Sequence, residues 1–222
     1  MKSPALEVLA AWILLMIRIW FFDGLGHWSW LATIPPLLFP LYYWYKDPEE
    51  FKKCFCPIGQ HLPLDYKWGY LLCFVSFGLF LRAILYVSEL NDPKISWFSG
   101  KLLYQIISSF STWLYPIWAL GQQLILNGYF ADKIDLALQG RYSQNHSYLE
   151  TALFTGLLFS LIHLPNPVLM PVTLIGGILS VYFFYRTQNI YLIAILHAAL
   201  ALSVKYSLPD SWHHNLRIGP GF

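Results

Sequence analysis

Residues 108–130 read SSFSTWLYPIWALGQQLILNGYF and contain no Asp, Glu, Lys or Arg. A helix of this length is long enough to cross a bilayer, since about 20 mostly apolar residues at 1.5 Å each span the hydrocarbon core. The stretch also carries three amide side chains, Gln122, Gln123 and Asn127. An uncompensated amide is costly in apolar surroundings, so we expect these side chains to have hydrogen-bond partners. A membrane helix with a polar face is therefore predicted here.

The composition of the whole chain indicates the same environment. Of its 222 residues, 57% are apolar, 18% are aromatic and only 12% are charged, about half the charged share of a soluble domain. We therefore predict an all-α fold, a polytopic integral membrane helix bundle with about seven transmembrane helices. The seven apolar segments are Ala5–Phe22, Trp28–Tyr45, Trp68–Leu90, Ser108–Phe130, Tyr148–Leu164, Pro167–Tyr185 and Asn189–Val204.

The chain shows no internal repeat and no soluble domain, so residues 1–222 are interpreted as a single membrane domain. Lysine and arginine outside the predicted helices number eight on the side of the N-terminus and four on the other side. Because cytoplasmic loops carry an excess of these residues, we expect a cytoplasmic N-terminus, in a bacterial-type inner (plasma) membrane. The net charge of +2, without a basic stripe, gives no sign of nucleic-acid binding.

Three predicted helices carry polar side chains well inside apolar sequence. Residues four apart lie on one face of a helix, so these side chains fall into stacked pairs. We expect the two histidines, on different helices, to face a shared polar cavity, because intramembrane ionisable groups normally face such interiors. The pairs are Gln123 with Asn127, Phe159 with His163 in FSLIHLPNP, and His197 with Ala201 in ILHAALA.

In this order and placement the motifs resemble those of the CAAX prenyl protease and bacteriocin-processing (CPBP, or Abi) family of intramembrane endopeptidases. The resemblance covers a core of about residues 108–204. The family pattern is Glu-Glu followed after three residues by Arg, then Phe, three residues and His, then His, three residues and Asn. Phe159, His163 and His197 match, whereas Gln122, Gln123, Asn127 and Ala201 stand where the family has its glutamates, arginine and asparagine.

The resemblance implies a peptidase in which the first glutamate is the general base, the histidines orient the attacking water and the asparagine stabilises the oxyanion. A neutral amide cannot take a proton from water. If the chain cleaves peptides, a histidine must act as the base, because an imidazole can accept a proton near neutral pH. The resemblance thus assigns the catalytic positions to Gln122, Gln123, His163 and His197, with Asn127, Phe159 and Ala201 supporting them.

The leading hypothesis is therefore a divergent intramembrane endopeptidase with impaired or lost activity. A second hypothesis belongs to another class, a non-catalytic binding or scaffolding protein that uses the inherited cavity. Its partner would be a membrane lipid, or a hydrophobic or membrane-embedded peptide or protein. The neutral amides favour the second hypothesis, although they also fit simple hydrogen bonding between packed helices.

No cofactor and no metal are expected, because two imidazoles without a carboxylate or thiolate fall short of a usual zinc shell. A second candidate, Cys54 and Cys56 with His61, is a weak metal motif at this spacing.

Two expectations concern the amides themselves. Gln123 and Asn127 should share a neutral hydrogen bond along one helix face. Gln122 should lie within one water of both His163 and His197 if it marks the position of the lost base.

Overall fold

The computed structural model describes residues 3–22, 31–55, 110–139 and 144–207. These ranges are helical apart from short turns and one isolated β-bridge, between Phe55 and Asn189. The third predicted helix, Trp68–Leu90, lies outside the described residues. The helices are α1 (Pro4–Phe22), η2 (Leu31–Thr33), α2 (Ile34–Lys46), α3 (Pro48–Lys53), α6 (Phe110–Ile125), η3 (Leu126–Ala131), α7 (Asp132–Leu138), α8 (Gln144–Ile162), α9 (Leu169–Thr187) and α10 (Ile190–Ser207).

The all-α prediction is confirmed for the described part of the chain. Among the described helices, α1 and α9 are long and apolar enough to cross a membrane. Shorter apolar stretches occur in α8, at Tyr148–Ile162, and in α10, at Ile190–Leu202. The number of seven spans stays a prediction.

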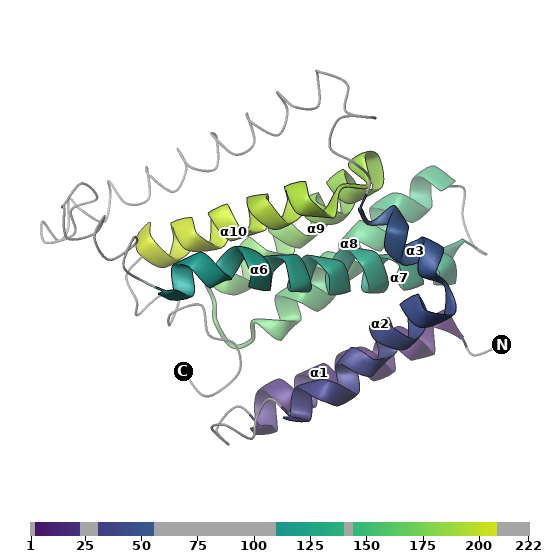
Figure 1. Cartoon of the computed structure of the whole chain (residues 1–222), viewed down its shortest axis with the longest axis horizontal. Helices are drawn as coiled ribbons and strands as arrows, with labels where there is room; N and C mark the ends of the chain where they lie inside the picture. Colours follow the sequence, from purple (N-terminus) through teal and green to yellow (C-terminus); the bar gives the residue numbers. More distant parts are fainter. Residues whose placement is uncertain (1–2, 23–30, 56–109, 140–143, 208–222) are drawn as a thin grey trace, which may run out of the picture.

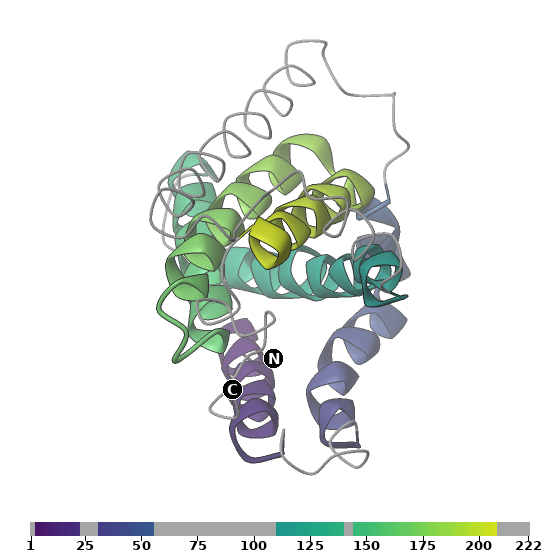
Figure 2. The same cartoon turned by 90° about the vertical axis from the view of Figure 1, so that its left-hand side faces the viewer.

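Two helix pairs form the body of the bundle. Helix α8 packs against α9 and helix α6 packs against α10, while α1 contacts α2 and α7. Figure 1 shows α1 and α2 on one side of α6, with α9 and α10 on the other side. In the perpendicular view of Figure 2, α1 and α2 project together from one side of the remaining helices.

Helices α8 and α9 approach each other backbone to backbone. A Cβ atom added to Gly177 would lie 2.8 Å from the Gly156 Cα atom, and one added to Gly156 would lie 2.9 Å from the Ile178 nitrogen. Both positions therefore require glycine. The neighbouring Gly176 is less crowded, because the nearest atom to an added Cβ would be a Leu200 methyl at 3.8 Å.

The helix predicted to end at Phe130 continues to Leu138. It passes through a π-helical segment, η3, and then through α7, where Asp132, Lys133 and Asp135 lie. The prediction of an end at Phe130 was wrong because these charges have partners on neighbouring helices. All six residues of η3 are buried. A π-helical turn is rare inside a long helix and is often found at a functional site.

The partners of Asp132 and Lys133 come from α1 and α2. The Lys133 ammonium lies 3.0 Å from a Glu7 carboxylate oxygen and 4.1 Å from the centre of the Tyr43 ring. The Tyr43 hydroxyl donates a hydrogen bond of 2.5 Å to Asp132. Glu7, a charge inside the first predicted helix, is thus paired. These contacts fix α1 and α2 against the start of α7.

The end of α3 is attached to the start of α10. The Ile190 N–H donates a 3.0 Å hydrogen bond to the Cys54 carbonyl, next to the bridge between Phe55 and Asn189. Cys54 is buried, and burial raises the pKa of its thiol to about 11, so the sulfur stays protonated at neutral pH. Cys56 and His61, the other members of the weak metal motif, lie outside the described residues.

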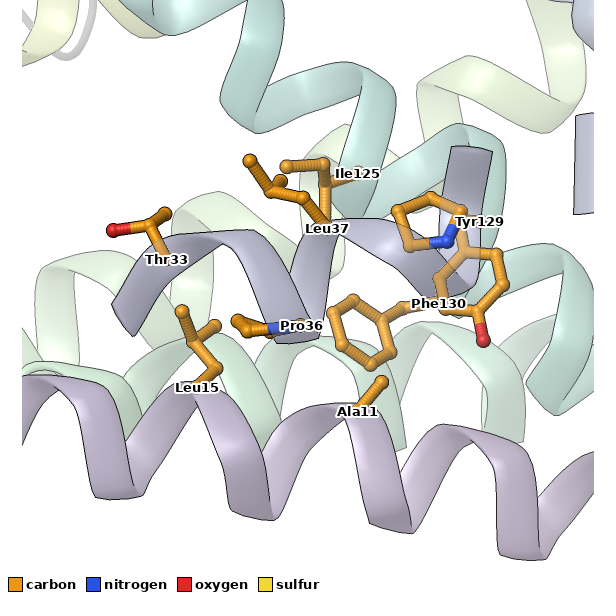
Figure 3. A pocket seen from close by; sticks show the side chains of 9 residues that line it. Ala11, Leu15, Thr33, Pro36, Leu37, Ile125, Tyr129 and Phe130 are labelled. Atoms are coloured by element: carbon orange, nitrogen blue, oxygen red, sulfur yellow. The ribbon is translucent and has the colours of Figure 1, made fainter. Parts of the chain in front are cut away.

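A small apolar cavity of about 30 Å³ lies where α1 and α2 meet the end of α6 and η3 (Figure 3). Its walls include Ala11, Pro36, Ile125 and Phe130. This volume corresponds to about one water molecule in the liquid, which is far too small for a peptide. None of the predicted site residues lines this cavity.

Candidate functional site

The centre of the site is a chain of neutral hydrogen bonds between α6, η3 and α10. The Asn127 Nδ2 donates to Gln123 Oε1 at 2.5 Å, and Gln123 Nε2 lies 2.6 Å from His197 Nδ1. Gln123 and Asn127 are each only 1% exposed. The predicted hydrogen bond between these two residues is confirmed, and it holds Gln123 against a motif histidine.

These hydrogen bonds determine which nitrogen of His197 carries the proton. Because Gln123 Oε1 accepts from Asn127, the Gln123 amide turns its NH2 group toward His197. An NH2 group can only donate, so His197 Nδ1 accepts and the proton of the neutral ring sits on Nε2. His197 therefore presents an N–H donor on its other edge.

His163 has the opposite arrangement. Its Nδ1 lies 2.8 Å from the Phe159 carbonyl oxygen, one helical turn earlier. A carbonyl oxygen can only accept, so Nδ1 carries the proton and Nε2 keeps its lone pair. His163 is buried, with 8% of its surface exposed. It presents an acceptor, which is the form that a general base requires.

The turn after His163 follows from the LPNP sequence. Helix α8 ends at Ile162, and the Asn166 side chain then accepts hydrogen bonds from the backbone N–H groups of Val168 at 3.0 Å and Leu169 at 2.9 Å, just before and at the start of α9. The Asn166 N–H donates to the His163 carbonyl at 2.9 Å. Asparagine side chains commonly accept such bonds from backbone N–H groups two or three residues on, so the run after the histidine fixes both this turn and the histidine backbone.

Phe159 brings the two histidines together. Its ring centre lies 5.0 Å from that of His163, nearly edge-on at 86°, and 5.8 Å from that of His197. Tyr115 approaches His197 from α6, with ring centres 6.4 Å apart. The sequence analysis missed Tyr115, although it lies seven residues before Gln122 and so on the same helix face.

The structure places the two glutamines differently. Gln123 contacts His197, whereas Gln122 is half-buried, and its enclosed Oε1 has no hydrogen-bond partner among the described residues. The expectation that Gln122 lies within one water of both histidines stays a prediction. Ala201 lies one turn beyond His197 on α10 and is partly buried.

The described ranges give little support for a metal site. There, no group of three or more His, Cys, Asp and Glu side chains is close enough to hold a metal ion. His197 Nδ1 is also engaged by the Gln123 amide. The absence of a cofactor stays a prediction.

The fold and the site define a class: helical proteins with apolar helices long enough to cross a membrane, in which two imidazoles contact one phenylalanine ring. Residues 106–203 match the family model described as type II CAAX prenyl endopeptidase Rce1-like. The resemblance seen in the sequence motifs is confirmed over this segment, which is similar to CAAX-protease-like membrane proteins. Neither the curated proteins nor the solved structures gave a match to the chain.

Proposed function

We propose that the chain is a divergent intramembrane endopeptidase of this family, in which His163 replaces the missing glutamate as general base. The observation that carries the proposal is the complementary protonation of the two imidazoles against one Phe159 ring. His163 offers a lone pair on Nε2, and His197 offers an N–H on Nε2. Peptide hydrolysis needs one group of each kind, a base for the water and a donor for the oxyanion.

The reaction follows from these two groups. His163 Nε2 takes a proton from water while the water oxygen bonds to the scissile carbonyl carbon. The oxyanion that forms accepts a hydrogen bond from His197 Nε2–H. The C–N bond then breaks, and the leaving amine takes the proton from His163 Nε2. Peptide and water become an acid and an amine, and both imidazoles return to their starting forms.

The matched test uses variants that keep the neighbouring hydrogen bonds. In His163→Asn the side-chain amide can still donate to the Phe159 carbonyl but cannot act as a base. We expect peptidase activity on a membrane-embedded peptide to fall by at least about 100-fold, the lower end of what general base catalysis contributes. His197→Asn should keep the contact with Gln123 and lose the oxyanion donor, with a similar loss. Unchanged cleavage in both folded variants would eliminate the proposal.

A non-catalytic binding protein is the second candidate. It is favoured by the neutrality of the Asn127–Gln123–His197 chain, in which the amides bond to one another and to an imidazole rather than to a charged group. This candidate expects a lipid or a hydrophobic peptide to co-purify, and it expects no cleavage by the unaltered chain. Native mass spectrometry that finds a bare monomer in several detergents would count against it.

A further inference from the structure

Tyr115 differs from the other large apolar side chains near the start of α6. Its ring centre lies 6.4 Å from that of His197, with the two ring planes inclined by 31°, and the residue is half-buried. Its neighbours on the helix are exposed to 44–68%, namely Trp113, Leu114, Ile117 and Trp118. Tyr115 therefore packs toward a motif histidine, whereas these neighbours form an outer surface of the helix.

The orientation of His197 depends on residues of two neighbouring helices. On α6, the Gln123 amide bonds to His197 Nδ1 at 2.6 Å and the Tyr115 ring approaches the imidazole. On α8, the Phe159 ring approaches it with a separation of 5.8 Å between ring centres. Both separations fall in the range of about 4.5–7 Å in which aromatic rings attract one another. His163, by contrast, bonds to a carbonyl of its own helix.

The hydrogen bond from Gln123 does not by itself fix the direction of the His197 Nε2–H group. A hydrogen bond weakens steeply only when its angle falls below about 120°, so the imidazole can tilt about Nδ1 while the bond survives. An oxyanion donor has to lie about 2.7–3.1 Å from the oxyanion. A misplacement of about 1 Å can cost on the order of 100-fold in rate. The rings packed on His197 are therefore needed to limit its tilt.

The two rings differ in what they contact. Phe159 approaches both imidazoles, so its replacement would disturb the proposed base together with the proposed donor. Tyr115 approaches His197. We propose that Tyr115 is a positioning residue of the peptidase site, whose ring holds the His197 imidazole so that Nε2–H points at the oxyanion. The effect of Tyr115 on turnover rests on the proposed function.

The experiment compares Tyr115→Leu, which removes the ring, with Tyr115→Phe, which keeps the ring and removes only the hydroxyl. Trp118→Leu is the matched control, because it removes an aromatic ring from the same helix at a side chain that is 60% exposed. If Tyr115→Leu does not fold, Tyr115→Met takes its place, since the flexible thioether side chain fills irregular gaps.

The first measurement is the NMR order parameter of the Cε1–H bond of each histidine ring, which reports motion of the ring on the ps–ns timescale. Tyr115→Leu should lower the order parameter of His197 and leave that of His163 unchanged. Tyr115→Phe and Trp118→Leu should leave both unchanged. An unchanged His197 order parameter in Tyr115→Leu would overturn the positioning role. An equal fall in Tyr115→Phe would overturn the assignment of that role to the ring.

The second measurement is peptide cleavage. Tyr115→Leu should lower kcat by roughly tenfold, less than the 100-fold or greater loss expected when an oxyanion donor is removed altogether. KM should stay the same, because an interaction that acts only in the transition state lowers kcat and kcat/KM equally. Tyr115→Phe should restore kcat to within about twofold of the unaltered chain, because the ring contact remains. A tenfold loss in Trp118→Leu would show a general effect of packing on α6 and would overturn the specific role of Tyr115.

The two measurements separate this inference from the proposed function. If the unaltered chain does not cleave peptide, the proposed function fails, while the order parameters still decide whether Tyr115 holds the His197 ring. If the unaltered chain cleaves and Tyr115→Leu cleaves equally well, the proposed function stands and the positioning role is overturned.

Discussion

Gln123 shows how a single residue controls the charge of the site. It is fully buried and joins Asn127 to His197 through an amide that both accepts and donates. A carboxylate at this position has no N–H to give to His197 and would need a cation to offset its burial. In the family pattern the arginine supplies that cation, and the corresponding residue here is the neutral Asn127. The two amides thus satisfy each other's hydrogen bonds without needing a charged group.

Replacing Gln123 by glutamate should therefore have a different effect from replacing Gln122 by glutamate. Gln123→Glu should destabilise the protein by about 3–5 kcal/mol, because a buried charge is left without a partner. Gln122→Glu should cost less, because Gln122 is only half-buried, and it should raise peptidase activity more than Gln123→Glu does. Chemical unfolding at pH 7 and peptide cleavage measure the two effects.

Lowering the pH is the control for this comparison. Protonation neutralises the introduced carboxyl, so the destabilisation by Gln123→Glu should shrink as the pH falls. Equal stability of the two variants across the pH range would contradict the assignment of Gln123 as the enclosed residue.

Some of this detail was accessible from the sequence. The spacing of four residues predicts the Gln123–Asn127 bond, because it depends only on helix geometry. The identity of the glutamine that meets His197 was not predictable, since it depends on how α6 is rotated against α10. Tyr115 was missed for a related reason, because a tyrosine in an apolar helix gives no signal until its neighbour is known.

At the scale of helices, the contact of α8 with α9 supports the site directly. Gly177 packs on Gly156, and a Cβ at Gly177 would also come within 3.4 Å of the Phe159 ring. That ring contacts both histidines. The separation of α8 and α9 therefore helps to determine where Phe159 lies.

Gly177→Ala should thus lower stability by about 1–3 kcal/mol, as overpacking of a close contact does. The neighbouring Gly176→Ala is the matched control, since its new methyl would meet only Leu200 at 3.8 Å. It should be neutral or gain up to about 1 kcal/mol from the higher helix propensity of alanine. Unfolding in detergent measures both, and equal effects would contradict the close approach of α8 and α9.

Apolar periodicity and length predicted most described helices to within a few residues. The continuation of α6 through η3 into α7 was not predicted, because charged residues normally signal the end of an apolar helix. Asp132 and Lys133 have partners on α1 and α2, more than 80 residues earlier in the chain. Such a pairing cannot be read from the local sequence. The short helix α3 was missed within a loop rich in proline.

At the scale of the whole molecule, Glu7 and Lys133 connect the N-terminal helices to the family core. Their side chains are 23% and 11% exposed, and α1 contacts α7 through this part of the structure. The matched family segment begins only at residue 106. The ion pair therefore links α1, which lies outside that segment, to α7 inside it.

Glu7→Gln should lower stability by about 1–3 kcal/mol, less than for a fully buried pair because part of each side chain meets solvent. Lys133→Met alone should also be destabilising, since it leaves the Glu7 carboxylate without its cation. The double variant should lose less than the sum of the two single losses. A double-mutant cycle from unfolding midpoints measures this coupling, and strictly additive losses would contradict the ion pair.

The π-helical segment η3 determines which kinds of mutation this chain can tolerate. A π-helical turn holds one more residue than the α-helical turn it replaces, so deleting one residue within Leu126–Ala131 should convert this segment to ordinary helix. Gln123 would keep its place at His197, and Asp132 and Lys133 would still face α1 and α2. A one-residue gap in an alignment at this stretch would therefore mark a chain with the same bundle, whereas a one-residue gap in the α-helical part of α6 would turn the neighbouring faces by about 100°.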